Sequence, residues 1–173
     1  MRVTRLIGPV LLLALALVAE SVWLTAIGLP GAVPPLVLVN ILALARTRTA
    51  QNAAVIGFAL GLLVDLVPPS ATPVGVSAFA FALAAFGFSF AKPLLEGSNF
   101  LTLASVSIAA AGVVVVRAIL GLAIGAASTP LSSVLVDLVT APLYAIMLAT
   151  FVFPIMARVE RIAAPPRQQT IFR

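Results

Sequence analysis

Four ionisable residues lie inside long apolar runs of this chain, and their types could do chemistry: Glu20, Asp65, Arg117 and Asp137. The two aspartates occupy identical pentapeptides, LVDLV, at residues 63–67 and 135–139. A carboxylate in apolar surroundings can pair with a buried cation, share a proton with a second carboxylate, or bind a cation. The elements that carry these residues decide which of these uses applies.

A pair of aspartates near one membrane face raises the hypothesis of an aspartyl protease, in which two carboxylates share a proton and activate water. Lipoprotein signal peptidases are of similar size and use such a dyad. Their aspartates lie in asparagine-rich motifs, which this chain lacks, since Asn40 and Asn52 are not placed to replace them. We therefore expect no catalytic residue and no enzymatic activity.

The composition is that of a membrane protein. Of 173 residues, 62% are hydrophobic and 9% are charged, and the mean hydropathy is +1.24. A soluble domain carries about 25% charged residues. Without cysteine or histidine, the chain has no disulfide, no thiol catalysis and no Ser-His-Asp triad. We expect no metal and no cofactor. We expect no nucleic-acid partner either, because the basic residues are spread between apolar runs without a patch.

Six apolar segments predict an all-α integral membrane protein with six transmembrane helices. A spanning helix needs about 20 apolar residues. The helices form one domain over residues 1–157, followed by a short basic tail over 158–173. The first run continues past Glu20, which favours an uncleaved helix over a signal peptide. The second begins with two prolines and is short, so it either spans or re-enters. The segments cover residues 6–28, about 33–45, 53–67, 74–91, 100–125 and 132–157.

The basic residues indicate how the helices are oriented. Arginine or lysine occurs before the first segment, between the second and third, between the fourth and fifth, and after the sixth. The alternate connections, 29–32, 68–73 and 126–131, contain no charged residue. Because basic loops stay in the cytoplasm, this alternation predicts six spans with both termini cytoplasmic.

The buried charges share helix faces with small residues. Such small-residue stripes are where membrane helices approach closely, so we predict helix packing at the four glycines involved. The stripes, at four-residue spacing, are Gly57, Gly61 and Asp65 in one segment and Arg117, Gly121 and Gly125 in another.

In this topology all four ionisable residues lie in the outer half of the membrane. We predict that Glu20, Arg117 and Asp137 form an intramembrane polar cluster, in which the aspartates are partners for Arg117. Three acids then face one arginine. If all three are ionised, two negative charges are in excess. At least one acid is then neutral or hydrated, or it pairs with a partner's transmembrane residue or a bound cation, and the sequence leaves these alternatives open.

One stretch, GFALGLLVDLVPPSATPVGVSAFAFALAAFGF at residues 57–88, resembles the MreD family of bacterial rod shape-determining membrane proteins. That family has a GLLxDL-type end to its third span, a short loop with proline and glycine, and then an aromatic-rich helix. The length and the short termini are similar as well. The matching positions are Gly61, Leu62, Leu63, Asp65, Leu66, Pro69 and Gly75.

The resemblance implies a non-catalytic scaffold of lateral cell-wall elongation in the bacterial cytoplasmic (inner) membrane. The implied partners are a single-span MreC-like protein, an MreB-type cytoskeleton, a RodA-type glycosyltransferase and a class-B penicillin-binding protein, besides membrane lipid. Asp65, Pro69 and Gly75 are the implied partner-binding surface. The family is also similar in fold to the substrate-binding membrane subunits of vitamin-uptake transporters, so a small-molecule uptake subunit is the alternative.

Overall fold

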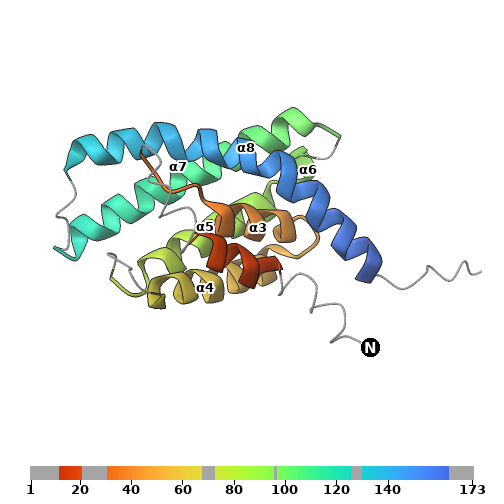
Figure 1. Ribbon diagram of the computed structural model, residues 1–173, viewed down its shortest axis with the longest axis horizontal. Helices are drawn as coiled ribbons and strands as arrows, with labels where there is room; N and C mark the ends of the chain where they lie inside the picture. Colours follow the sequence, from red (N-terminus) through yellow and green to blue (C-terminus); the bar gives the residue numbers. More distant parts are fainter. Residues whose placement is uncertain (1–11, 21–30, 68–72, 96, 126–129, 164–173) are drawn as a thin grey trace, which may run out of the picture.

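The computed structural model describes residues 12–20, 31–67, 73–95, 97–125 and 130–163. Within these ranges every regular element is a helix, which confirms the predicted all-α class. A helical segment over residues 12–20 comes first and carries no label in Figure 1. The labelled helices are α3 (Leu36–Ala45), α4 (Ala50–Leu66), α5 (Val76–Phe90), α6 (Lys92–Leu95), α7 (Asn99–Ala123) and α8 (Leu131–Ala163).

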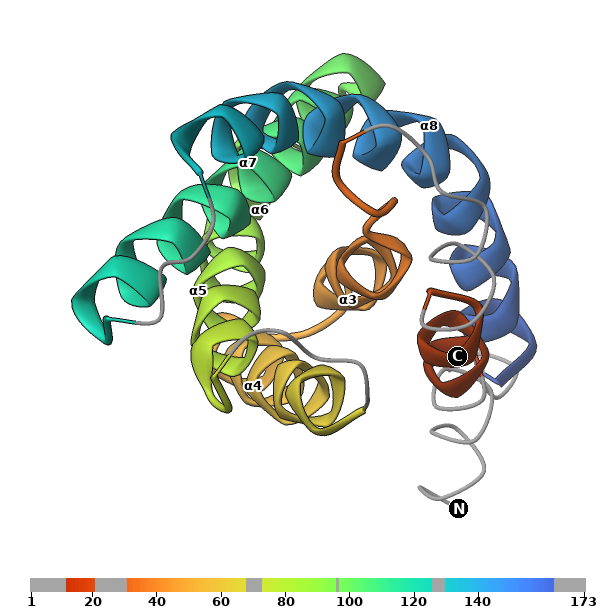
Figure 2. The same ribbon diagram turned by 60° about the vertical axis from the view of Figure 1, so that its left-hand side comes forward.

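Helix α3 is the centre of the bundle. Helices α4, α5, α7 and α8 stand around it in Figure 2, and it contacts all four. Every residue from Val37 to Ala45 is buried, so protein surrounds α3 on all sides. This explains why all its residues except Asn40 are apolar. Its 10 residues extend about 15 Å, roughly half the thickness of a bilayer's hydrocarbon core. The prolines before α3 suit a helix start, because the N–H groups of a first turn have no acceptor within the helix and proline has no N–H to leave unpaired.

Helices α4 and α5 form the most closely packed pair. A Cβ atom added at Gly61 would lie 2.5 Å from the Ala78 Cα, and one at Gly57 would lie 2.6 Å from the Phe81 carbonyl oxygen. Both distances are shorter than real contacts of this kind. The two glycines therefore let the backbones of α4 and α5 touch.

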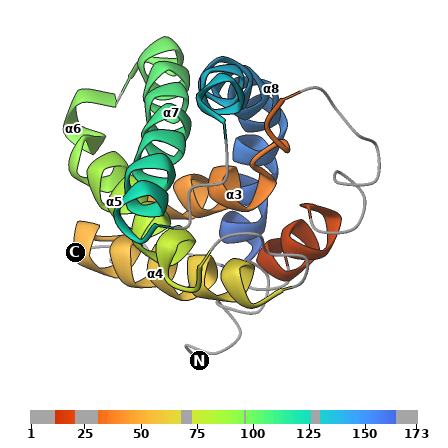
Figure 3. The same cartoon turned by 90° about the vertical axis from the view of Figure 1, so that its left-hand side faces the viewer.

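Helices α7 and α8 are the longest elements and lie side by side in Figures 1 and 3. By length and composition, two described helices could cross a membrane: Asn99–Ala123 and Leu131–Arg161. Helices α3, α4 and α5 are shorter apolar helices of 10, 17 and 15 residues. The structure thus supports two of the six predicted spans by this measure. Most of the first predicted segment lies outside the described residues.

The exterior of the bundle is largely apolar. Large side chains face outward on α7 and α8, including Ile108 (72% exposed), Val139 (62%) and Phe151 (65%). Helices α4 and α5 add Phe58 and Phe79, which are 48% and 52% exposed. An apolar surface of this extent marks contact with lipid or with other proteins.

The charged connections meet at one end of the bundle. Thr47 donates a hydrogen bond to the Glu160 carboxylate at 2.7 Å, which joins the α3–α4 connection to the last turns of α8. The Arg48 carbonyl accepts a hydrogen bond from Ser89 at 3.0 Å and another from the Lys92 ammonium group. The alternation of charged and uncharged connections predicts that these segments share one end.

Candidate functional site

Asp65, near the end of α4, binds the start of α5. Its side chain is 2% exposed. The Oδ2 atom accepts hydrogen bonds from the backbone N–H groups of Gly75 (2.8 Å), Ser77 (3.1 Å) and Ala78 (3.3 Å). These N–H groups begin α5, whose own N-cap residue supplies no side-chain acceptor. The Asp65 carboxylate is therefore the N-terminal cap of α5, and its charge meets the positive end of that helix dipole.

This geometry gives Asp65 a structural position instead of the partner-binding surface expected from the sequence. A buried carboxylate with three donors on one oxygen does not present its charge to another protein. Asp65 is also absent from the cavity that Asp137 lines, so the two aspartates do not face a common space as a proton-sharing pair would. The two LVDLV copies therefore occupy different environments.

Gly75 shapes the start of α5, and its backbone φ is +99°. Glycine adopts this left-handed conformation without steric penalty, whereas other residues rarely do. The conformation lets the Gly75 N–H point at Asp65. Pro69, the remaining member of the expected surface, lies outside the described residues.

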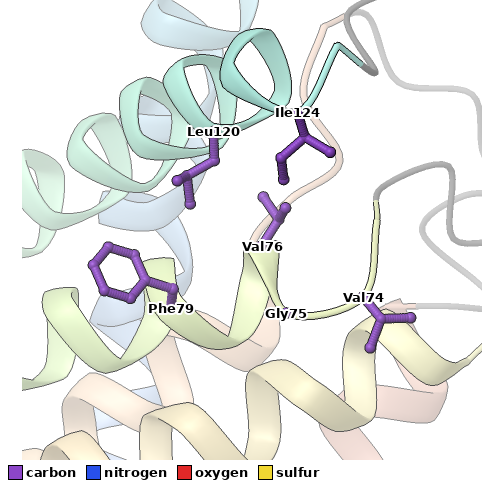
Figure 4. A pocket seen from close by; sticks show the side chains of 6 residues that line it. All are labelled: Val74, Gly75, Val76, Phe79, Leu120 and Ile124. Atoms are coloured by element: carbon purple, nitrogen blue, oxygen red, sulfur yellow. The ribbon is translucent and has the colours of Figure 1, made fainter.

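A shallow apolar pocket, the α5–α7 pocket, lies beside this turn and has a volume of about 220 Å³. In Figure 4, Val76 points toward Leu120 and Ile124 of α7. Three lining side chains are well exposed: Val74 (63%), Phe79 (52%) and Ile124 (59%). Gly75 completes the lining. Of the described residues of the expected functional surface, only Gly75 lines this pocket, and its neighbours there are apolar. No charged residue that the structure describes lines the pocket.

Glu20 is a second carboxylate that caps a helix, and the helix it caps is α3. Its Oε2 atom accepts a hydrogen bond from the Val37 N–H at 2.7 Å. Helix α3 needs this acceptor, because its N-cap residue is Pro35, which has no side-chain acceptor. Glu20 therefore ties the 12–20 segment to the central helix.

Replacing Glu20 with alanine is expected to lower the free energy of unfolding by about 1 kcal/mol, the usual effect of losing a helix cap. Glu20→Gln keeps an acceptor oxygen and should lose less. Titration of the detergent-solubilised protein with a denaturing detergent, followed by circular dichroism, measures both. An alanine variant as stable as the wild type would show that the cap contributes nothing.

Arg117 lies on α7 and reaches α5. Its Nη2 donates to the Ser77 hydroxyl at 2.6 Å, and the guanidinium carbon lies 5.3 Å from the centre of the Phe81 ring. Nε is buried and has no hydrogen-bond partner among the residues that the structure describes. The carboxylates whose charges act on Arg117 are Glu20 and Asp65. Of the two aspartates predicted as partners of Arg117, Asp65 thus acts on it through the attraction of opposite charges.

Glu20, Arg117 and Asp137 surround one cavity, the central cavity, with a volume of about 640 Å³. Residues 31–38 and helices α5, α7 and α8 supply most of its walls, which are largely apolar. Among the described residues, Arg117 donates to Ser77, and no hydrogen bond or ion pair joins it to Asp137. The three residues predicted as a cluster therefore line one cavity, and Asp137 is not a close ion-pair partner of Arg117.

Gly121 and Gly125 do not make the close helix contacts that their spacing predicts. Among the described residues, a Cβ atom added at either one would meet no atom within 4 Å. Gly121 lines the central cavity, and Gly125 follows the end of α7 with a φ of +72°. These two glycines therefore leave space or form a turn.

The fold and this network define a class of protein. It is a helical membrane protein in which buried carboxylates cap helices, an apolar exterior surrounds the bundle, and charges gather at one end. Within the ranges that the structure describes, no group of three Asp, Glu, His or Cys residues could hold a metal ion.

Comparison with known families gives the particular assignment. Residues 2–160 match the family model of the rod shape-determining protein MreD, so the chain belongs to the MreD family. This confirms the resemblance seen at residues 57–88. Membership implies a role in rod shape determination, as a structural membrane protein and not as a member of a known enzyme family. No curated protein and no solved structure matches the chain.

Proposed function

We propose that this protein is a non-catalytic scaffold of the cell-wall elongation complex in the bacterial cytoplasmic membrane. Its partners would be an MreC-like single-span protein and wall-synthesis enzymes, bound through helix contacts. Membership of the MreD family supports this role. The engagement of Glu20 and Asp65 as helix caps supports it too, because neither carboxylate is then free for acid–base chemistry.

The proposed orientation has six spans with both termini in the cytoplasm. Its support is the charge distribution: Arg48, Lys92 and Glu160 lie at one end of the bundle with the basic connections. The positive-inside rule directs that end to the cytoplasm. The α5–α7 pocket and the central cavity then lie toward the outer face, where wall synthesis takes place.

The observation that carries the proposal is the α5–α7 pocket. Isolated apolar side chains on a lipid-facing helix need no explanation, but here Val74, Phe79 and Ile124 are exposed around a depression. Helix association in membranes depends on close packing of shapes, and a depression offers a place for a partner's side chain. The first turn of α5, capped by Asp65, holds one side of this depression in place.

Site-directed photocrosslinking in native membranes tests the contact. With a photoreactive amino acid at Phe79, we expect one dominant crosslink, to an MreC-like single-span protein identified by mass spectrometry. The matched control is Phe58 on α4, which is similarly exposed at 48% against 52%. Crosslinks of equal yield at both positions, or only to lipid at Phe79, would contradict the proposed surface.

The alternative, a substrate-binding subunit of an uptake transporter, predicts a different partner. Crosslinking and affinity purification would then recover a pair of transporter ATPases. The family assignment does not favour this alternative.

A further inference from the structure

The central cavity has the properties of a ligand site, and the scaffold role does not use it. Its volume of about 640 Å³ falls within the range of roughly 300–1,000 Å³ that is usual for such sites. Its lining is mainly apolar, with few polar side chains. This combination suits a molecule with a long apolar part and a small polar head. The ionisable or hydroxyl side chains in the lining are Glu20, Arg117, Ser133 and Asp137.

Arg117 brings a guanidinium group to the wall of this cavity. One guanidinium nitrogen already donates to Ser77, and the ring of Phe81 covers one face of the group. The Nε–H has no partner among the described residues, but it is enclosed by protein. Guanidinium groups bind phosphate and carboxylate oxygens especially well. An anionic oxygen in the cavity would therefore accept from the part of the guanidinium group that lines it.

Asp137 offers the complementary group from the facing helix. Glu20 is already engaged by the Val37 N–H, whereas Asp137 makes no hydrogen bond to a described residue and lines the cavity from α8. A carboxylate in this position attracts an ammonium group. A quaternary ammonium group would need an aromatic cage, and the one aromatic ring lining the cavity, Phe81, is occupied by Arg117. A primary ammonium, which can donate hydrogen bonds, fits better.

The cavity has apolar walls that reach the lipid-facing exterior. Leu122 at the end of α7 and Leu131 at the start of α8 both line it, and they are 69% and 74% exposed. Inside, Leu38, Val76 and Val113 form buried apolar wall. An aliphatic chain could therefore lie against the walls while its head group lies between α7 and α8.

We propose that the central cavity binds a phospholipid with a phosphate and a primary ammonium in its head group, of the phosphatidylethanolamine type. The phosphate oxygen accepts from the Arg117 guanidinium group, the ammonium donates to Asp137, and an acyl chain covers the apolar wall. The head group is neutral overall, with its negative charge beside Arg117 and its positive charge beside Asp137. Binding is non-covalent and the lipid is not transported.

Native mass spectrometry of the full chain in detergent tests the proposal, with phosphatidylethanolamine, phosphatidylcholine and phosphatidylglycerol offered singly and in competition. We expect one phosphatidylethanolamine per chain, bound about tenfold more tightly than the other two, because each lacks one charged hydrogen bond. Soluble glycerophosphoethanolamine, which has the head group without acyl chains, should fail to compete. Equal affinity for the three lipids, or full competition by the soluble head group, would overturn the proposal.

Two variants separate the contacts. Asp137→Asn should remove the preference for phosphatidylethanolamine over phosphatidylglycerol and leave phosphatidylglycerol binding intact. Arg117→Lys keeps the charge but loses the fixed, planar array of guanidinium donors, and it should weaken both lipids about tenfold. Glu160→Gln, at the opposite end of the bundle, is the matched control and should bind like the wild type. A preference that survives Asp137→Asn in a folded variant would place the lipid elsewhere. Neither result depends on the crosslink at Phe79, so the scaffold proposal stands or falls separately.

Discussion

Asp65→Ala is expected to lower the free energy of unfolding by about 3 kcal/mol, whereas the same change at Asp137 should lower it by less than about 1 kcal/mol. Removing the Asp65 carboxylate leaves the N–H groups of Gly75, Ser77 and Ala78 without their acceptor at a buried helix start. Asp137 accepts no such bond and is only partly buried. The two aspartates have identical neighbours in sequence, LVDLV, so each is a matched control for the other.

Denaturing-detergent titration followed by circular dichroism measures both changes, and membrane insertion is checked by fractionation. Asp65→Asn retains an uncharged acceptor oxygen and should fall between the alanine variant and the wild type. If Asp65→Ala unfolds at the wild-type midpoint while cells lose their shape, the carboxylate acts on a partner and not on α5. Equal losses at Asp65 and Asp137 would also contradict the capping role.

Gly61→Ala is expected to lower the free energy of unfolding by about 2–3 kcal/mol, an unusually large effect for one methyl group. The new Cβ would lie 2.5 Å from both the Ala78 Cα and the Ser77 carbonyl oxygen. Both are backbone atoms, so relief requires α4 and α5 to separate and not merely a side chain to rotate. The separation would also lengthen the bonds from α5 to Asp65.

Gly121→Ala is the control, because a Cβ there meets no described atom within 4 Å. In a helix, alanine is favoured over glycine by about 1 kcal/mol, so this variant should be as stable as the wild type or slightly more stable. Thermal unfolding of both variants in the same detergent provides the comparison. A Gly61→Ala variant that melts at the wild-type temperature would show that the α4–α5 backbones are not in contact.

Much of the fold follows from sequence pattern. The apolar segments gave helices in every described range, and the alternation of charged and uncharged connections predicted which connections share an end. The spacing of Gly57, Gly61 and Asp65 predicted one face of α4, and that face packs on α5. These features depend on residues close together along the chain, where helical periodicity alone determines the face.

The roles of the buried acids depend on contacts between segments, which periodicity does not determine. Asp65 caps α5 only because Gly75 lies beside it in the fold, and Glu20 caps α3 although the two belong to different segments. A signal was nevertheless present: Pro35 and Gly75 begin helices without side-chain caps, so acceptors had to come from elsewhere. The position of α3 at the centre also needed the structure, because a short apolar helix can lie inside a bundle or span it.

The ionisable residues buried in the bundle therefore divide into two groups. Asp65 and Glu20 are engaged in helix capping, and they hold the first turns of α5 and α3. Arg117 and Asp137 line the central cavity, where we propose a lipid head group. We propose that partners contact the apolar α5–α7 pocket. On these proposals, separate substitutions alter stability, ligand binding and partner binding.

Cell shape during depletion of this protein is the most direct test of a role in rod shape determination. The gene is placed under a repressible promoter in the organism that encodes it, and cell width and length are followed as the protein disappears from the membrane fraction. We predict that cells widen and become round within a few generations, and that the wild-type chain restores rods. Cells that stay rod-shaped with normal width after the protein is gone would contradict the assigned role.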